Sequence, residues 1–390
     1  MPRIGVDATC WHNNRGYGRH ARALLSALVR VDSRNQYVFL TDDINGIDGQ
    51  PSEVEVRPVA ASTRTIEAAS ADGRRGIFDI WRMSRAFAAP DFDLLLFPTV
   101  YSYVPVLSRA KKILMIHDVI AETFPQLTFP RRLSRWLWNA KVAMGQWQAD
   151  SLVTVSEYSR RGLIEHFRLP PGRVHVVGEA SDPVFQLLKD PQPTARLKEL
   201  GLAEGRFIVY VGGFGPHKNL TTLVAAFAAL TTHDDLDDVR LVLVGEYGKE
   251  VFHSDHATIR QQIHDLGLES RVFFTGFLPD KDLVILLNRA TLLALPSLME
   301  GLGLSAIEAA ACGLPVVATT ASPLPELLGA GGIFVDPMDR AGWEQALLSV
   351  IRSKDLRCRL RCEGLASAGH LTWDKAARQL STVIHKVAIG

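Results

Sequence analysis

Residues 207–230 read FIVYVGGFGPHKNLTTLVAAFAAL, and this stretch indicates the fold of the chain. An apolar run, Phe207–Val211, leads into a glycine turn and then into a helical segment, Leu220–Leu230. Continuous apolar runs, unlike alternating ones, are typical of parallel strands that are covered on both faces. The stretch therefore predicts one strand–turn–helix unit of a doubly wound α/β domain.

The same order of strand and helix recurs along nearly the whole chain. The predicted strands of the first half are Ile4–Asp7, Tyr37–Leu40, Leu94–Phe97, Ile113–Ile116, Leu152–Val155 and Val174–Val177. Those of the second half are Phe207–Val211, Arg240–Val244, Val272–Thr275, Leu292–Leu295, Pro315–Ala318 and Gly332–Val335. This pattern predicts two Rossmann-like, doubly wound parallel sheets.

A boundary between two domains is expected where helix-breaking prolines gather. Asp182-Pro183 and the segment Asp190–Pro193 interrupt the chain there. A chain of 390 residues is also too long for one ordinary core. Ligands of such sheets bind at the carboxyl ends of the strands, so we expect the active site in a cleft between two facing domains.

The overall composition excludes some classes of function. Forty-three basic residues balance 42 acidic ones, which argues against a nucleic-acid binder. The four cysteines, Cys10, Cys312, Cys358 and Cys362, lack zinc-site spacing, and such few, scattered thiols suggest a reducing compartment. No apolar run is long enough for a signal peptide or a membrane span. We therefore expect a cytoplasmic protein.

The stretch Phe129–Trp147 is basic and rich in tryptophan. One interpretation is a surface that touches anionic lipid headgroups or a lipid-linked acceptor at the inner face of a membrane. The alternative is an ordinary amphipathic helix whose tryptophans pack inward, and apolar faces at helical spacing are usually core. We favour the second interpretation and keep peripheral membrane contact through residues 129–147 open.

Two glycine turns stand between a predicted strand and a predicted helix. Asn13-Asn14-Arg15-Gly16-Tyr17-Gly18-Arg19 precedes the predicted helix Arg19–Arg30, and the turn after Val211 ends in His217-Lys218-Asn219. Glycines let the backbone approach a phosphate, and a helix N-terminus supplies donors and a positive dipole end. Both turns are predicted phosphate sites, and the lysine of the second favours a diphosphate.

Polar residues also follow two further predicted strands. His117-Asp118 ends the strand Ile113–Ile116, although a lone histidine is more often a satisfied core residue. Glu300 follows the strand Leu292–Leu295, and Glu308 falls in a helix that starts near Gly303. Two carboxylates at this spacing could flank one ligand, with the amides between them facing a negatively charged leaving group.

The segment Glu300–Glu308, followed by Ala309–Val317, resembles the E-x7-E signature of retaining glycosyltransferase family 4 (glycosyl transferases group 1), which has the GT-B fold. The resemblance covers essentially the whole chain. Further motifs occur in the family's order: Gly16-Tyr17-Gly18-Arg19, His117-Asp118, Ser156-Glu157-Tyr158-Ser159, His217-Lys218-Asn219-Leu220 and Phe274-Thr275-Gly276-Phe277. It implies an acceptor-side domain over residues 1–185, a nucleotide-sugar-binding domain over 195–370, and a C-terminal helix over 371–390 that crosses back to the first domain.

The resemblance also implies a role for each site residue. Glu308 would bind the ribose hydroxyls, and Glu300 would face the donor sugar. The diphosphate would be bound by Gly16, Gly18, His217, Lys218, Gly301, Leu302 and Gly303. His117 would lie near the transferred sugar and, with Glu300 and Lys218, make up the catalytic set.

Four positions depart from the family pattern. Gly213 and His217 stand where relatives often have an arginine, and His217 could replace that cation if a neighbouring anion keeps it protonated. Leu302 and Ser305 replace a common Phe and Pro, which we do not interpret as loss of activity.

The function that follows is retaining transfer of a sugar from a nucleoside-diphosphate sugar to a glycan or lipid-linked acceptor, in bacterial polysaccharide synthesis. GDP-mannose is the donor suggested by similarity to polysaccharide mannosyltransferases. Front-face substitution needs no protein nucleophile, and we expect neither a metal nor a cofactor. Asp91-Phe92-Asp93 has the form of a D-x-D metal motif, but it precedes the strand Leu94–Phe97, so we interpret it as a strand entrance.

Three other functions were weighed. A sugar-nucleotide 2-epimerase shares this fold but needs no acceptor, and a catalytically silent sugar-nucleotide-binding subunit would fit the missing arginine at His217. A nicotinamide dehydrogenase is disfavoured because no complete dinucleotide fingerprint is present. Slow donor hydrolysis without acceptor would separate an active transferase from a silent subunit.

Overall fold

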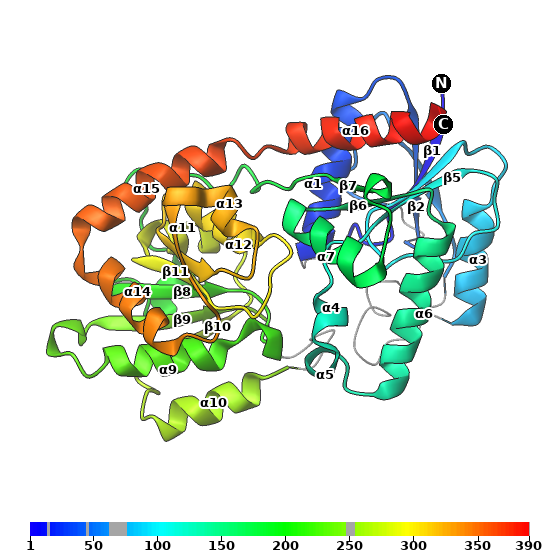
Figure 1. The fold of residues 1–390 in the computed structure, drawn as a ribbon. Helices are drawn as coiled ribbons and strands as arrows, with labels where there is room; N and C mark the ends of the chain where they lie inside the picture. The colour runs from blue at the N-terminus through cyan, green and yellow to red at the C-terminus, as the bar shows by residue number, and fades with distance from the viewer. Residues whose placement is uncertain (14–15, 44–46, 62–75, 247–253, 390) are drawn as a thin grey trace. The chain divides into compact units, whose positions relative to one another are not determined.

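A computed structural model of the protein describes residues 1–13, 16–43, 47–61, 76–246 and 254–389 (Figure 1). Asn14 and Arg15 of the first glycine turn lie outside the described residues. Contacts between residues divide the chain into two compact units. Unit 1 comprises Met1–Pro125, Phe129–Glu179 and Thr372–Gly390, and unit 2 comprises Gln126–Thr128 and Ala180–Leu371.

Unit 1 contains a seven-stranded parallel sheet in the order β3-β2-β1-β4-β5-β6-β7. The strands are β1 (Arg3–Asp7), β2 (Gln36–Thr41), β3 (Glu55–Pro58), β4 (Leu94–Phe97), β5 (Lys111–Met115), β6 (Ser151–Thr154) and β7 (Val174–Val176). Every residue of β4 and β6 is buried, as expected for central strands with helices on both faces.

The helices that cover this sheet come from three parts of the chain. They are α1 (Gly16–Val31), α3 (Ile77–Phe87), α4 (Ile120–Thr123), α6 (Arg132–Gln148), α7 (Glu157–Phe167) and α16 (Trp373–Ile389), with α5 (Pro125–Thr128) between α4 and α6. The C-terminal helix α16 packs along α1 and also contacts β5 (Figure 1). Helix α6 contacts β5 as well.

Unit 2 contains a six-stranded parallel sheet in the order β10-β9-β8-β11-β12-β13. Its strands are β8 (Arg206–Val211), β9 (Val239–Val244), β10 (Val272–Gly276), β11 (Leu292–Leu295), β12 (Val316–Thr319) and β13 (Gly332–Val335). Its helices are α8 (Ala195–Glu199), α9 (Leu220–Leu230), α10 (His256–Asp265), α11 (Asp280–Arg289), α12 (Leu304–Ala311), α13 (Leu324–Leu328), α14 (Arg340–Arg352) and α15 (Lys354–Gly369).

Each sheet has a point where its strand order reverses. In unit 1 the chain runs from β1 outward to β2, while β4 lies on the other side of β1. In unit 2 β8 stands between β9 and β11 in the same way. Ligands of open parallel sheets bind at the carboxyl ends of strands at such reversal points. The loops after β1, β4, β8 and β11 are therefore the places to look for a site.

The predicted fold, two doubly wound parallel sheets, is confirmed, with all twelve predicted strands present within two residues at either end. The additional strand β3 was missed because it is a half-exposed edge strand that carries Glu55, Arg57 and Pro58. The predicted start of the first helix at Arg19 was wrong, since α1 begins at Gly16. Gly16 and Gly18 thus belong to the first turn of a helix and not to a loop before it.

Candidate active site

The centre of the site in unit 2 is an ion pair between the ends of two neighbouring strands. Lys218 follows β8 and Glu300 follows β11, and these strands pair in the sheet. Lys218 Nζ donates a hydrogen bond to Glu300 Oε1 at 2.7 Å, and Ser297 Oγ donates to the same oxygen at 2.6 Å. The structure thus brings two of the predicted catalytic residues into direct contact.

Glu300 is a buried carboxylate, with 7% of the residue exposed. Burial alone would raise the pKa of Glu300, but the Lys218 ammonium and the hydrogen bonds from Lys218 and Ser297 lower it below its ordinary value. Glu300 is therefore ionised at neutral pH and balances the charge of Lys218. In the ligand-free protein the lysine is held in place by a partner that an incoming anion would have to replace.

His217 carries no charge in the ligand-free protein, and its role as a cation beside bound phosphates stays a prediction. Burial, followed by the repulsion of Lys218, lowers the pKa of His217 to about 4, so the ring is neutral at neutral pH. Its carbonyl oxygen accepts a hydrogen bond from the Leu298 amide at 2.8 Å, which ties the turn after β8 to the loop after β11.

Asn219 is a site residue to which the sequence assigned no role. Its backbone is left-handed, with φ of +54°, at the entrance to α9. Its side-chain amide donates to the carbonyl oxygens of Pro296 at 3.0 Å and Pro337 at 2.8 Å, and Thr222 donates to its Oδ1. Asn219 therefore fixes the Lys218 turn to two other loops, and its place beside Lys218 in the motif was the signal available.

The segment between the two glutamates adopts the expected loop and helix. Gly303 is the N-terminal cap of α12 with φ of +83°, and an added Cβ would lie 2.8 Å from Leu324 Cδ1. Glycine is required there by both backbone and space. Leu302 is buried, and Glu308 is buried within α12. Glu300 and Glu308 therefore both lie in the segment that runs from the end of β11 into α12.

In unit 1 the predicted glycine loop is the first turn of α1. Gly16 is exposed at the end of the helix, whereas Gly18 is buried. An added Cβ on Gly18 would lie 2.1 Å from the Asn13 carbonyl oxygen, so glycine allows the chain after β1 to pack directly on the helix. The Arg22 guanidinium donates to the same carbonyl at 2.9 Å. This turn is a closely packed helix entrance.

The predicted residue His117 lies at the carboxyl end of β5 in contact with residues that sequence reasoning missed. Its Nε2 lies 3.2 Å from the Pro98 carbonyl oxygen, and its Nδ1 lies 3.5 Å from Glu179 Oε1. His20 of α1 reaches the same carboxylate oxygen with its Nδ1 at 2.6 Å. Neighbouring Asp118 accepts from the Ile120 amide at 2.9 Å and so helps to start α4.

His20, His117 and Glu179 have their donor atoms within 4.8 Å of one another, and they are the one such group of histidine, cysteine and acidic side chains within the described residues. Their mutual contacts are those of a buried ion-pair network. No sequence motif links them, because they come from α1, the loop after β5 and the loop after β7.

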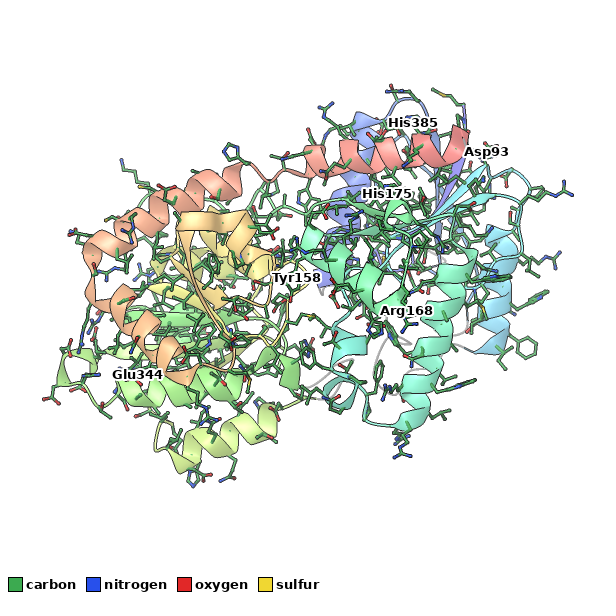
Figure 2. All side chains as sticks on the ribbon, in the orientation of Figure 1. Asp93, Tyr158, Arg168, His175, Glu344 and His385 are labelled. Carbon is green, nitrogen blue, oxygen red and sulfur yellow. The ribbon has the colours of Figure 1, made fainter. Side chains whose placement is uncertain are left out.

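Asp91 and Asp93 lie at the entrance to β4, as the sequence interpretation proposed. Asp93 is labelled in Figure 2. Its Oδ2 accepts from the Arg3 amide at 2.7 Å, and Asp91 forms ion pairs with Arg3 at 2.9 Å and Arg57 at 3.0 Å. Both carboxylates are thus paired at the amino edge of the sheet, away from the strand ends that carry His117.

Helix α6 corrects the interpretation that its tryptophans pack inward. Trp138 does so, with its Nε1 donating to Glu122 at 2.7 Å. Trp136 and Trp147 are 65% and 79% exposed. Within the residues that the structure describes, no helix combines the length and the apolar character that a bilayer crossing needs.

Two family models match the chain, one in each half. Residues 14–183 match Glycosyltransferase Family 4, and residues 193–365 match Glycosyl transferases group 1. Together with the two doubly wound sheets, these matches define a GT-B glycosyltransferase fold. The chain belongs to glycosyltransferase family 4.

Individual relatives share less than a third of their residues with this chain over the regions compared. The chain is 29% identical to D-inositol 3-phosphate glycosyltransferase from Corynebacterium glutamicum (strain R), over 60% of its own length and 57% of that protein. It is 27% identical to O-antigen chain mannosyltransferase B from Escherichia coli, over 76% and 75%. The crystal structure of Anabaena HepE in complex with UDP-glucose superposes with a TM-score of 0.73 at 17% identity, covering 99% of this chain and 100% of HepE.

Proposed function

We propose that this protein transfers a sugar, with retention of anomeric configuration, from a nucleoside-diphosphate sugar to a glycan or lipid-linked acceptor. The observation that carries the proposal is the Lys218–Glu300 pair at the reversal point of the unit 2 sheet, directly before the glycine-capped helix α12. This combination suits a donor whose sugar faces a carboxylate while its diphosphate meets a cation and the backbone amides at a helix N-terminus.

Each residue of this half-site has a task in the proposed reaction. The donor diphosphate replaces Glu300 as the ion-pair partner of Lys218, and the amides of Gly301–Gly303 bind the diphosphate oxygens. Glu308 accepts hydrogen bonds from the ribose hydroxyls. As the glycosidic bond breaks, charge grows on the diphosphate, and the ammonium and amides stabilise it without rearranging. The acceptor hydroxyl then attacks the same face that the diphosphate leaves, so the configuration is retained.

Within this function we propose GDP-mannose as the donor. This choice is supported by the similarity to the Escherichia coli protein, which is named a mannosyltransferase. The matched region covers about three quarters of each chain. UDP-glucose, the ligand in the HepE crystal structure, is the competing donor.

Thermal unfolding with a panel of nucleoside diphosphates tests this choice. A ligand present at a hundred times its Kd stabilises the native state by about 2.7 kcal/mol, and GDP should give the largest rise in Tm. A larger rise in Tm with UDP would show that the donor carries uridine instead of guanosine. No rise in Tm with any diphosphate would contradict the proposed donor site.

We further propose that unit 1 contacts an anionic membrane surface, where a lipid-linked acceptor would be found. Helix α6 exposes apolar side chains at helical spacing together with Arg131, Arg132 and Arg135, a pattern typical of interfacial helices. The exposed apolar residues of α6 are Leu133, Trp136, Leu137, Met144 and Trp147, and those of α3 are Ile77, Phe78 and Trp81.

Helix α3 supports the same surface. The β3–α3–β4 and β5–α6–β6 connections run in the same direction across the sheet. Right-handed crossovers therefore put both helices on one face of unit 1.

Sedimentation with vesicles tests this contact. Vesicles of equal parts phosphatidylglycerol and phosphatidylcholine should carry the protein down, and pure phosphatidylcholine should carry much less. Replacing Trp136 and Trp147 by serine should release it, whereas Phe277→Ser, which removes an exposed aromatic ring from unit 2, should not. Equal binding of both variants would contradict the assignment to α6.

A further inference from the structure

A buried network in unit 1 surrounds the proposed catalytic residue His117. Glu179, after β7, is 7% exposed and meets two imidazole rings with the same carboxylate oxygen. The rings of His20 and His117 stand edge to face with centroids 4.7 Å apart, and Trp373 of α16 packs against His20. The side chain of His117 is 17% exposed, so a small part of it reaches solvent.

The partners of the His117 ring determine its protons. A carbonyl oxygen can only accept a hydrogen bond, so the contact of Nε2 with Pro98 requires a proton on Nε2. Glu179 Oε1 lies 3.5 Å from Nδ1, an ion-pair distance rather than a short hydrogen bond, and an ionised carboxylate at this distance favours a proton on Nδ1. A neutral imidazole carries one proton and would set a lone pair against one of these oxygens. The doubly protonated ring satisfies both.

His20 does not need a second proton. Its Nδ1 faces Glu179, but its Nε2 faces Met115 Sδ at 3.3 Å, and a thioether sulfur is a weak acceptor at most. A single proton on Nδ1 is enough for this ring, because Nδ1 approaches Glu179 at 2.6 Å as an ion-pair contact without hydrogen-bond geometry. The network then holds one carboxylate, one imidazolium and one neutral ring, which leaves no net charge in the buried space.

We propose that Glu179 is a positioning residue that holds His117 as an imidazolium cation at the carboxyl edge of the unit 1 sheet. With both nitrogens engaged, His117 cannot act as a general base, and its contribution to the transfer would be its fixed positive charge. Its action on the reaction rests on the proposed function, whereas its charge state does not.

Electrostatics of the neighbouring groups agree with this assignment. Burial would lower the pKa of His117, but Glu179, the Pro98 carbonyl and Asp118 outweigh it and raise that pKa. Burial lowers the pKa of His20 in spite of Glu179. Burial would raise the pKa of Glu179, but the two histidines hold it far below its ordinary value. His20, Glu179 and Asp118 are the titratable groups that act on His117 among the described residues.

Nitrogen-15 NMR of histidine-labelled full-length protein tests the charge state directly. His117, identified by comparison with His117→Gln, should carry protons on both nitrogens at pH 7 and titrate above the ordinary value of about 6.5. Glu179→Gln should move this titration below that value, and Glu179→Asp should retain it in part. Titration of wild-type His117 at or below 6.5 would overturn the proposal, even if Glu179→Gln does not fold.

The chain offers a control in the exposed pair His264–Glu269, whose Nδ1 and Oε1 atoms lie 2.6 Å apart, as those of His20 and Glu179 do. Glu269→Gln should change the titration of His264 and leave His117 as it was. The alternative is that a metal ion, and not a protonated His117, is the cation beside Glu179. If zinc added to chelator-treated protein shifts the signals of both His20 and His117, the cation between them is a metal, and the proposal is wrong.

Kinetics separate the positioning role from a structural one. Glu179→Gln should lower kcat about ten-fold or more, with the donor KM within about three-fold. Because wild-type His117 has a raised pKa, activity should fall as pH rises through that pKa, and the variant should show this fall at lower pH. An unchanged pH profile would contradict the role in transfer. If the wild type transfers no sugar, the NMR titration still decides the charge state.

Discussion

The two proposed catalytic cations are each balanced by a buried glutamate in their own unit. Lys218 pairs with Glu300, and His117 pairs with Glu179. An ion pair taken out of water gains little net stability, but removing one partner leaves an uncompensated charge. Such pairs hold a positive charge in a defined position while no anion is bound. We propose that a bound diphosphate replaces the Glu300 carboxylate at an ammonium that is already positioned.

Lys218→Ala should lower the turnover rate more than it weakens donor binding. Loss of about 3 kcal/mol of transition-state stabilisation corresponds to roughly a hundred-fold in kcat. Because Glu300 loses its partner, the unfolding free energy should also fall, by up to about 3 kcal/mol, so the rate is measured well below the variant's Tm. Lys281→Ala removes an exposed lysine of unit 2 and should change neither quantity. Turnover of Lys218→Ala within about two-fold of wild type would contradict its role.

Glu308→Ala should weaken binding of the nucleoside diphosphate itself. One hydrogen-bond acceptor that is charged is worth roughly 1.5–3 kcal/mol, which corresponds to about ten- to a hundred-fold in Kd. Titration calorimetry with the diphosphate measures this, and Glu363→Ala on the exposed surface of α15 serves as the control. Unchanged affinity in Glu308→Ala would remove this residue from the ribose site.

At the scale of elements, the site depends on where helices begin. The loop after β11 enters α12 through Gly303, whose backbone is left-handed. The loop after β8 enters α9 through Asn219, also left-handed, which the Pro296 and Pro337 carbonyls hold in place. Two residues with left-handed backbone, Gly303 and Asn219, thus stand at the N-termini of two helices of unit 2.

Gly303→Ala should destabilise the protein more than Gly267→Ala does. Both residues are left-handed, with φ of +83° and +66°, and this conformation costs an alanine about 1–2 kcal/mol. An added Cβ at Gly267 meets nothing within 4 Å, whereas at Gly303 it meets Leu324 at 2.8 Å. Urea unfolding of the two variants should therefore differ, and only Gly303→Ala should also weaken diphosphate binding. Equal losses of unfolding free energy in the two variants would show that the Leu324 side chain moves aside without an energetic penalty.

The elements show what a sequence can predict and what it cannot. Buried strands such as β4 and β11 were predicted because a continuous apolar run is a local signal. Glu300 and Lys218 were found as motifs, but their contact depends on the pairing of β8 with β11. The His20–Glu179 contact has no local signal, since α1 and the loop after β7 are far apart in sequence. The exposure of Trp136 was likewise decided by which face of α6 meets β5.

At the scale of the whole molecule, the two units share the same arrangement of sheet and charged residues. Each unit has a parallel sheet with one reversal point, and each places a basic side chain, His117 or Lys218, beside a buried glutamate at the carboxyl ends of its strands. The C-terminal helix α16 returns to unit 1 and brings Trp373 onto His20. Charge for the departing diphosphate is thus proposed to come from side chains and helix ends.

Sugar transfer should therefore survive a strong chelator. Lys218 and the amides at the start of α12 are proposed to neutralise the leaving group, and Asp91 and Asp93 are engaged with Arg3 and Arg57. Activity after treatment with EDTA should remain within about two-fold of the untreated enzyme. Loss of activity that manganese or magnesium restores would refute this mechanism and return attention to the two aspartates.

The stereochemistry of the first product tests the central proposal most directly. Proton NMR can follow the anomeric signals of GDP-mannose, and of UDP-glucose as the alternative donor, from the moment wild-type protein is added with or without an acceptor glycan. The account predicts a new glycoside with the donor's anomeric configuration, and slow release of nucleoside diphosphate when acceptor is absent. A product of inverted configuration, a donor changed only at the sugar's second carbon, or no reaction of any common sugar nucleotide would contradict it.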